Sequence, residues 1–140
     1  MQLKKIVLPL DGSEHSMHAA KYAVDLAKLT DAEVVLVHSF GGIPKVLGED
    51  GLHEVIAELT KESNEILEPF IWLFEDKKVK FKTRVVRGRI ADSIVTLAEE
   101  ENADLIIIGS RGLSNVERIL LGSVTTRVVQ MAHCPVLVMR

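Results

Sequence analysis

The chain has 140 residues, of which 47% are hydrophobic and 26% are charged, with a net charge of −3. This length and composition argue against disorder and predict a single domain over residues 1–140, long enough to bury a core. The small negative charge and the low aromatic content, 4%, predict no broad basic field and no base-stacking platform, so we expect neither nucleic acid nor a membrane as a partner.

The amino-terminal segment does not look like a targeting signal. Lys4 and Lys5 precede only five apolar residues before Asp11, which is too few for a secretory signal, and no stretch reaches the length that spans a bilayer. A single cysteine, Cys134, predicts neither an internal disulfide nor a metal site built from cysteines. We therefore expect a cytoplasmic protein.

The hydrophobic pattern alternates between strand-like and helix-like segments from the start. Residues 5–10 form a short apolar run, ended by Asp11, that predicts a first strand, and Ser13 could cap the helix that follows. Residues 33–39 predict a second strand that is buried on both faces. Residues 41–51, rich in glycine, predict a loop.

Residues 52–70 place apolar side chains at intervals of three and four, which predicts a long helix. Pro69 lies inside this pattern and is expected to kink or break the helix, because it removes an N–H and crowds the preceding turn. The segment 71–74 (IWLF) is unusually apolar for a helix end. It either packs in the core or offers a surface to a partner.

The remaining segments continue the alternation. Residues 80–86 predict a third strand, and Gly88 leads into a helix whose end, residues 99–101, consists of three glutamates that we expect to be solvated. Residues 104–108 and 135–139 predict two further strands, with a helix over 124–131 between them. This order predicts a doubly wound α/β fold: a parallel sheet with right-handed crossovers and helices on both faces. Ligands bind beyond the carboxyl ends of such strands, where the strand order reverses.

A glycine-rich segment, GSRGLSNVERILLGSVTT over residues 109–126, follows the fourth predicted strand. Glycines at 109, 112 and 122 are expected to permit positive φ and close approach of a ligand. Gly122 and Ser123 open the next helix, whose first N–H groups would form an anion site. The alternative is that these are ordinary turn glycines and that Ser123 is a plain helix cap.

The spacing of the glycines separates this loop from other phosphate loops. A Walker A loop contains a lysine, but this chain has none after Gly109. The GxGxxG fingerprint of dinucleotide-binding loops is also absent. The pattern G-x2-G-x9-G-S, together with the opening VLPLDGSEHS and the closing CPVLVMR, resembles the universal stress protein family along the whole chain. The resemblance implies a five-stranded sheet in the order 3-2-1-4-5. The chain departs from many members at Arg89, where they have a proline.

The resemblance also implies a ligand, an adenine nucleotide and above all ATP, bound with Mg²⁺. Pro9 and Leu10 would flank the base or sugar, the backbone of Val37 would read adenine, and Asp11 would contact the ribose or Mg²⁺ through water. An Asx-turn is the alternative for Asp11. The implied phosphate and ribose contacts, made mostly by backbone N–H groups, are those of Gly109, Gly112, Gly122, Ser123 and Val124.

Several polar residues near the predicted site have two interpretations each. Ser13 faces the glycine loop if the first and fourth strands are neighbours. Arg111 and Arg118 either clamp phosphate oxygens or are solvated surface charges. We expect His38 to be packed and hydrogen-bonded rather than catalytic. The spacing of His15 and His18 is weak evidence for a metal site.

These features favour an ATP-binding stress-response or regulatory module with slow or no hydrolysis, because no general base or activated nucleophile is evident. The alternative is an interaction protein of the same fold that binds no nucleotide. Either would form a homodimer through the apolar last strand, residues 136–139, whose outer edge needs a partner. The rival is a monomer whose edge is shielded by the 41–51 loop or by the last helix.

Overall fold

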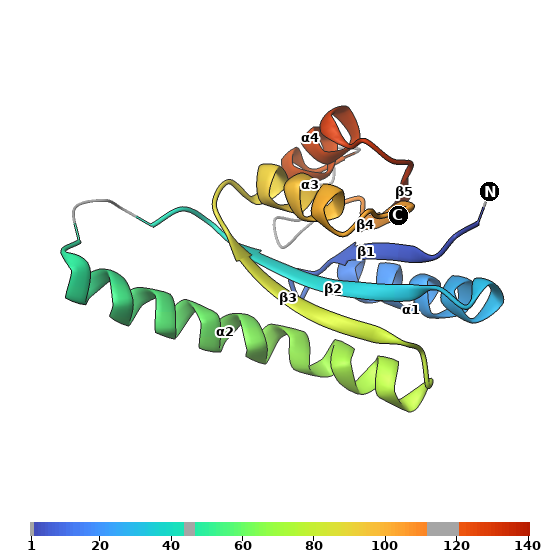
Figure 1. The fold of residues 1–140 in the computed structure, drawn as a ribbon, viewed down its shortest axis with the longest axis horizontal. Coiled ribbons are helices and arrows are strands. Elements are labelled where there is room, and N and C mark those ends of the chain that lie inside the picture. Colours follow the sequence, from blue (N-terminus) through green and yellow to red (C-terminus); the bar gives the residue numbers. More distant parts are fainter. Residues whose placement is uncertain (1, 44–46, 112–120) are drawn as a thin grey trace.

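The computed structural model describes residues 2–43, 47–111 and 121–140, which form a three-layer α/β fold (Figure 1). The strands are β1 (Lys5–Pro9), β2 (Glu33–Phe40), β3 (Phe81–Arg87), β4 (Leu105–Gly109) and β5 (Val136–Met139). The helices are α1 (Glu14–Thr30), α2 (Glu49–Asp76), α3 (Ile90–Glu100) and α4 (Ser123–Met131). The strands are parallel and lie in the order β3-β2-β1-β4-β5, which confirms the predicted doubly wound fold.

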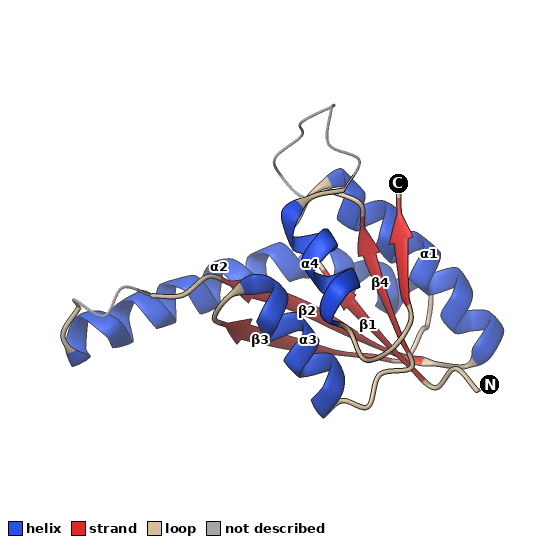
Figure 2. Ribbon diagram, turned by 90° about the horizontal axis from the view of Figure 1, so that it is seen from above, coloured by secondary structure: helices blue, strands red, loops and turns tan. Residues whose placement is uncertain are grey.

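The continuous apolar character of the strands follows from burial on both faces of the sheet. Ile6 and Leu8 of β1 belong to the core under α1 and α2, whereas Val7 belongs to the core under α3 and α4. Because successive strand residues point to opposite faces, each strand must be apolar throughout. Figure 2 shows the two helical layers on either side of the sheet.

Helix α2 is longer at both ends than the pattern predicts. It begins at Glu49, inside the segment expected to be loop, and it runs through Pro69 without interruption, so the expected break is wrong. Pro69 and Glu65, whose carbonyl loses its partner, are both exposed, and water can therefore satisfy that carbonyl. Leu67 and Phe70 are buried on either side of the proline and hold the helix against the sheet.

The apolar segment 71–74 closes the core at the end of α2. Phe74 is fully buried, with its ring centroid 5.9 Å from that of Phe81 on β3, and Ile71 and Leu73 pack against the same core. Trp72 points away and is 72% exposed. Core packing is thus the right interpretation for three of the four residues. Of the helices within the described residues, none combines the length and apolar character that crossing a membrane requires.

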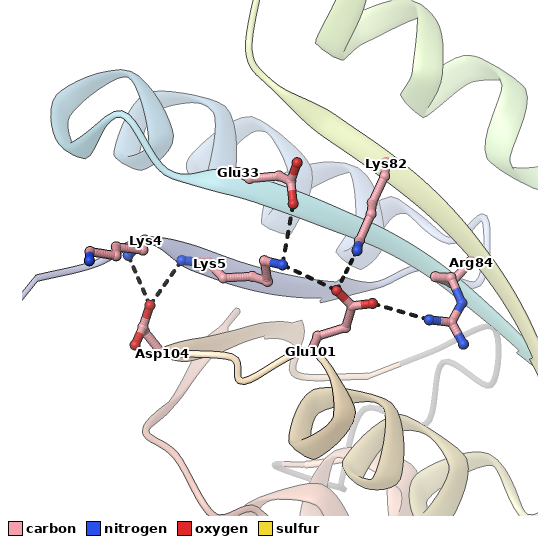
Figure 3. A network of polar contacts seen from close by, with 7 residues as sticks. All are labelled: Lys4, Lys5, Glu33, Lys82, Arg84, Glu101 and Asp104. Atoms are coloured by element: carbon pink, nitrogen blue, oxygen red, sulfur yellow. Dashed lines mark hydrogen bonds and ion pairs between the residues drawn. The ribbon is translucent and has the colours of Figure 1, made fainter.

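The glutamates that end α3 do not share one environment, and the expectation that all three are solvated is wrong for Glu101. Its side chain is only 8% exposed and forms ion pairs with Lys5 at 3.3 Å, with Arg84 at 3.1 Å and with Lys82 (Figure 3). Burial alone would raise the pKa of Glu101, but hydrogen bonds and charges from Lys82 and Lys5 outweigh it and hold that pKa below its usual value. The network ties α3 to β1 and β3.

Replacing Glu101 by Gln is expected to lower the free energy of unfolding by about 1–3 kcal/mol at neutral pH, because three cations lose their shared anion. The partners are partly exposed, so the loss stays below that of a fully buried pair. Because the folded-state pKa is depressed, the contribution is complete above the unfolded pKa of about 4.3 and disappears as the pH falls through the folded value. Urea unfolding of parent and variant at neutral and strongly acid pH measures both effects.

Glu100→Gln, at a side chain 59% exposed, is the control and should change the free energy of unfolding by less than about 0.5 kcal/mol. A loss equal to that of Glu101→Gln would contradict the role assigned to Glu101.

Candidate functional site

The candidate site lies at the carboxyl ends of β1 and β4, the neighbouring strands at which the order of the sheet reverses. The crossover from β1 passes through α1 on one face, and the crossover from β4 passes through α4 on the other (Figure 2). Such diverging connections leave a crevice in doubly wound sheets. A cavity of about 460 Å³ lies there. That volume is in the range of about 300–1,000 Å³ typical of small-molecule sites.

The cavity is lined by apolar side chains and by polar residues that lie on, or at the ends of, β1, α1, β2, β4 and α4. It consists of Pro9, Leu10, Asp11, Ser16, Val37, His38, Ser39, Ile66, Ile90, Ile94, Ile108, Gly109, Arg111, Gly122, Ser123, Val124 and Thr125. Nine of the predicted site residues are among them. Ser13 does not line the cavity, and Gly112 and Arg118 lie outside the described residues.

Asp11 is held in place by two serines at the start of α1. Its Oδ1 accepts hydrogen bonds from the Ser13 N–H at 2.9 Å and the Ser16 hydroxyl at 2.6 Å. Ser13 caps α1 by accepting from the Ser16 N–H, as predicted. Burial by itself would raise the pKa of Asp11, but these hydrogen bonds lower it below its usual value and keep the carboxylate ionised. The Asx-turn given as the alternative for Asp11 is therefore present, and Asp11 also lines the cavity.

The start of α4 presents backbone N–H groups to the same cavity. Gly122 is the N-cap, and among the described residues no side chain caps the helix, so the alternative in which Ser123 is the cap is wrong. The Gly122 N–H donates to the Ser110 carbonyl at 2.7 Å, and the Thr125 hydroxyl donates to the Gly109 carbonyl at 2.7 Å. These two bonds fix the helix start against the end of β4. An uncapped helix start that lines a cavity is suited to an anion.

The glycines of the loop do not act through positive φ where the structure describes them. Gly122 has φ −67° and ψ 162°, values open to any residue, and the positive φ values among the described glycines occur at Gly12 (83°) and Gly88 (125°). A Cβ at Gly109 would lie 2.8 Å from the His15 Cβ and 3.0 Å from the His15 carbonyl oxygen. The absence of a side chain at Gly109 thus lets α1 approach β4 closely.

The backbone of Val37 bonds to the β1 side of the sheet, whereas that of Ser39 has no partner on this side among the described residues. The Val37 carbonyl accepts from the Leu10 N–H at 2.8 Å, and the Val37 side chain is fully buried. Hydrogen bonds along β2 alternate, and the bonds of Glu33 and Val37 go to β1. The N–H and C=O of Ser39 therefore also face the β1 side.

At that point β1 has left the sheet. Its chain turns at Asp11, whose N–H donates to the Ser16 hydroxyl at 3.0 Å, and within the described ranges no backbone group bonds to Ser39 on this side. Ser39, which lines the cavity, consequently offers it one backbone donor and one backbone acceptor. Ser39 lies two residues beyond Val37, the β2 residue of the last β1–β2 pair, and no residue type in the sequence marks that position.

Two other polar pairs complete the walls near the end of β2. The Nδ1 of His38 lies 2.8 Å from the hydroxyl of Ser63, a buried residue of α2, and the hydroxyls of Ser39 and Ser93 lie 2.6 Å apart. Burial lowers the pKa of His38, and the negative charge of Asp11 only partly offsets it. His38 is therefore a packed, neutral, hydrogen-bonded residue, as expected. The part of the chain that the structure describes holds no cluster of three metal-ligating side chains, so His15 and His18 have no third ligand there.

Comparison with known proteins places the whole chain in one family. The family model described as "Universal stress protein family" matches residues 2–140. Universal stress protein MJ0531 of Methanocaldococcus jannaschii is 46% identical over 139 residues, covering 98% of this chain and 82% of that protein. The solved structure of MJ0577 has a TM-score of 0.86 at 36% identity, covering 99% of this chain and 96% of that one. A universal stress protein from Archaeoglobus fulgidus in complex with dAMP has a TM-score of 0.71 at 26% identity and covers both chains fully.

Proposed function

The chain belongs to the universal stress protein family, and we propose that it binds an adenine nucleotide, ATP with Mg²⁺ above the others, as a homodimeric stress-response or regulatory module. The observation that carries this proposal is one cavity where an uncapped helix start, an ionised carboxylate and an open backbone donor–acceptor pair meet. A relative of the same fold has been solved with dAMP, which supports the adenine nucleotide class. We keep the cytoplasm as the expected location.

The base would lie at the end of β2. Adenine presents a donor, its amino group, next to a ring nitrogen acceptor, and this edge matches the open C=O and N–H of Ser39. Ile90, Ile94 and Ile108 supply apolar surface for the faces of the base. This assignment replaces the Val37 backbone by that of Ser39, because the Val37 carbonyl is already bonded to Leu10.

The phosphates would lie at the start of α4. The N–H groups of Ser123, Val124 and Thr125 belong to its first turn and line the cavity, and Arg111 lines it as well. Asp11 offers only Oδ2 to a ligand, because Oδ1 already accepts two hydrogen bonds. One carboxylate oxygen suits a ribose hydroxyl or a water on Mg²⁺, so the phosphates would be the main ligands of that ion.

We propose slow or no hydrolysis. Among the described residues of the cavity, Asp11 is ionised but bound to two serines, and His38 is hydrogen-bonded to Ser63. Neither is arranged as a base next to the start of α4 with a third group that orients it, as efficient general-base catalysis requires.

Titration calorimetry with ATP and Mg²⁺ tests the proposal, with dAMP, AMP and GTP as comparison ligands. Saturable binding of adenine nucleotides, with GTP weaker by at least about tenfold, is expected because GTP presents an acceptor where adenine presents a donor. Absence of binding at millimolar ATP would refute the nucleotide function and favour an interaction protein of the same fold. A turnover number within the usual enzyme range of about 1–10³ per second would refute slow hydrolysis.

Ser39→Pro is expected to weaken nucleotide binding by about tenfold or more, because proline removes the N–H proposed to contact the base and places a ring carbon there. The fold should survive, since this N–H makes no bond in the ladder with β1 or β3. Ser39→Ala keeps the N–H and loses only the 2.6 Å contact with Ser93, so it serves as the matched control. If calorimetry found both variants equally weakened, the side chain rather than the backbone would be the contact.

A further inference from the structure

A strongly basic segment accompanies β3. Residues 77–89 contain seven lysines and arginines and no acidic residue, namely Lys77, Lys78, Lys80, Lys82, Arg84, Arg87 and Arg89. They make up seven of the seventeen lysines and arginines of the chain, so the net charge of −3 conceals a local excess of positive charge.

Two of these cations are neutralised by ion pairs within the protein, and Arg87 and Arg89 remain able to bind an external anion. Lys82 and Arg84 bind the glutamates at the end of α3. Arg87 and Arg89 are exposed, and neither forms an ion pair with any residue in the described ranges. Together with Arg84 they line a groove of about 440 Å³ between β3 and α3, which also includes Glu100, a partner of Arg84. The one acid at the start of α3, Asp92, is itself bonded to Arg127 at 3.1 Å.

The outer edge of β3 is an open strand edge. β3 is the last strand of the sheet on its side, with β2 as its neighbour (Figure 2). The ladder to β2 includes the Lys80 carbonyl and the Gly88 N–H, and its alternation leaves the N–H and C=O groups of the odd-numbered residues on the outer side. Those residues are Phe81, Thr83, Val85 and Arg87. No backbone group in the described ranges bonds to them there.

We propose that the outer edge of β3 binds an extended, acidic segment of a partner protein, which adds to the sheet as a sixth strand and pairs its carboxylates with Arg87 and Arg89. An open edge is a template for another strand, and its backbone groups give affinity while side chains give selectivity. Arginine binds carboxylates in a bidentate manner, which favours aspartate and glutamate in the added strand.

The same features disfavour two other occupants. A second copy of β3 would bring two basic segments together, and in each of them the described ion pairs neutralise only Lys82 and Arg84 of the seven cations. Single-stranded nucleic acid would match the charge but prefers exposed aromatic side chains for stacking, and Phe81, the aromatic residue of β3, packs against Phe74 in the core. A phosphodiester chain also lacks the N–H groups that would satisfy the carbonyls of the edge.

Fluorescence anisotropy with a labelled peptide tests the proposal. The probe is a peptide of about nine residues with alternating glutamate and valine, because β3 spans seven residues. Saturable binding at micromolar protein is expected. A peptide with lysine in place of glutamate, a peptide N-methylated on the amides of one edge, and an oligothymidylate of equal charge should each bind at least about tenfold more weakly. No saturable binding of the probe at millimolar protein would refute the proposal.

Two variants separate pairing from simple charge attraction. Thr83→Pro removes an outward N–H without touching the ladder to β2 and should weaken the glutamate–valine peptide about tenfold. The double variant Arg87→Glu, Arg89→Glu should weaken it at least as much. If the charge reversal weakens peptide binding but neither Thr83→Pro nor N-methylation of the peptide weakens it, strand addition is refuted. Oligothymidylate binding as tight as the peptide would also refute it. If Thr83→Pro did not fold by circular dichroism, the N-methylated peptide would decide alone.

Discussion

Gly122→Val should reduce adenine nucleotide affinity by at least about a hundredfold, the largest loss that we expect from a single change in the cavity. Gly122 is the N-cap of α4 and lines the cavity beside the first N–H groups of that helix. Two methyl groups there would occupy space proposed for phosphate oxygens. The backbone values of Gly122, φ −67° and ψ 162°, are accessible to valine, so a loss of binding would not stem from backbone strain.

Calorimetry with ATP and Mg²⁺, together with thermal unfolding, measures this effect apart from stability. Gly42→Val is the matched control, because a Cβ at Gly42 would meet nothing within 4 Å, and it should bind nucleotide like the parent protein. Unchanged affinity in a folded Gly122→Val protein would show that the start of α4 does not hold the phosphates, even if nucleotide binds elsewhere in the cavity.

The strand and helix order could be predicted from the sequence because it depends on local periodicity. Burial on both faces makes each strand an apolar run, and the amphipathic helices between them repeat at three and four residues. The reversal of strand order between β1 and β4 came from the family resemblance alone, since spacing along the chain does not determine which strands are neighbours.

The errors concern features that depend on residues far apart in the sequence. Glu101 looks like a solvated helix end, but Lys5, 96 residues away, reaches it across the sheet. Gly109 remains a predicted ligand-binding glycine, but the sequence does not reveal that its missing side chain also makes room for His15 of α1. Pro69 looks like a helix break, but burial of Leu67 and Phe70 on the sheet outweighs one lost hydrogen bond. None of these contacts has a local signal.

In the candidate site, too, the features with a local sequence signal could be predicted and those that depend on distant residues could not. Asp11 and the start of α4 could be predicted because turn chemistry and helix starts have sequence signatures. The proposed contact of the Ser39 backbone, in place of that of Val37, could not be predicted, because a backbone group has no residue type to mark it. Its role depends on where β1 leaves the sheet, and the helix that starts at Glu14 decides that point through the hydrogen bonds of Asp11.

The second open edge of the sheet, that of β5, carries the proposed homodimer. Ile106 N–H donates to the Pro135 carbonyl and Ser110 N–H to the Met139 carbonyl, so the ladder to β4 uses the odd-numbered residues of this segment. The N–H and C=O groups of Val136 and Val138 therefore point outward. All four residues of β5 are apolar and only partly buried, and antiparallel pairing of two such edges across a two-fold axis would satisfy the open groups.

Val138→Pro should convert the homodimer into a monomer. Proline removes an outward N–H of the proposed dimer interface but none from the ladder to β4, so the fold should persist. Light scattering after gel filtration should give about 31 kDa for the parent, twice the 15.5 kDa of the chain, and 15.5 kDa for the variant. Thr83→Pro makes the same change at the opposite edge, β3, and should remain dimeric.

The described parts of the 41–51 segment lie toward the β3 side, away from β5, so α4 is the remaining candidate to shield the β5 edge (Figures 1 and 2). A parent protein of 15.5 kDa at micromolar concentration would favour that monomer and end the dimer proposal, whereas a dimer that survives Val138→Pro would move the interface away from β5.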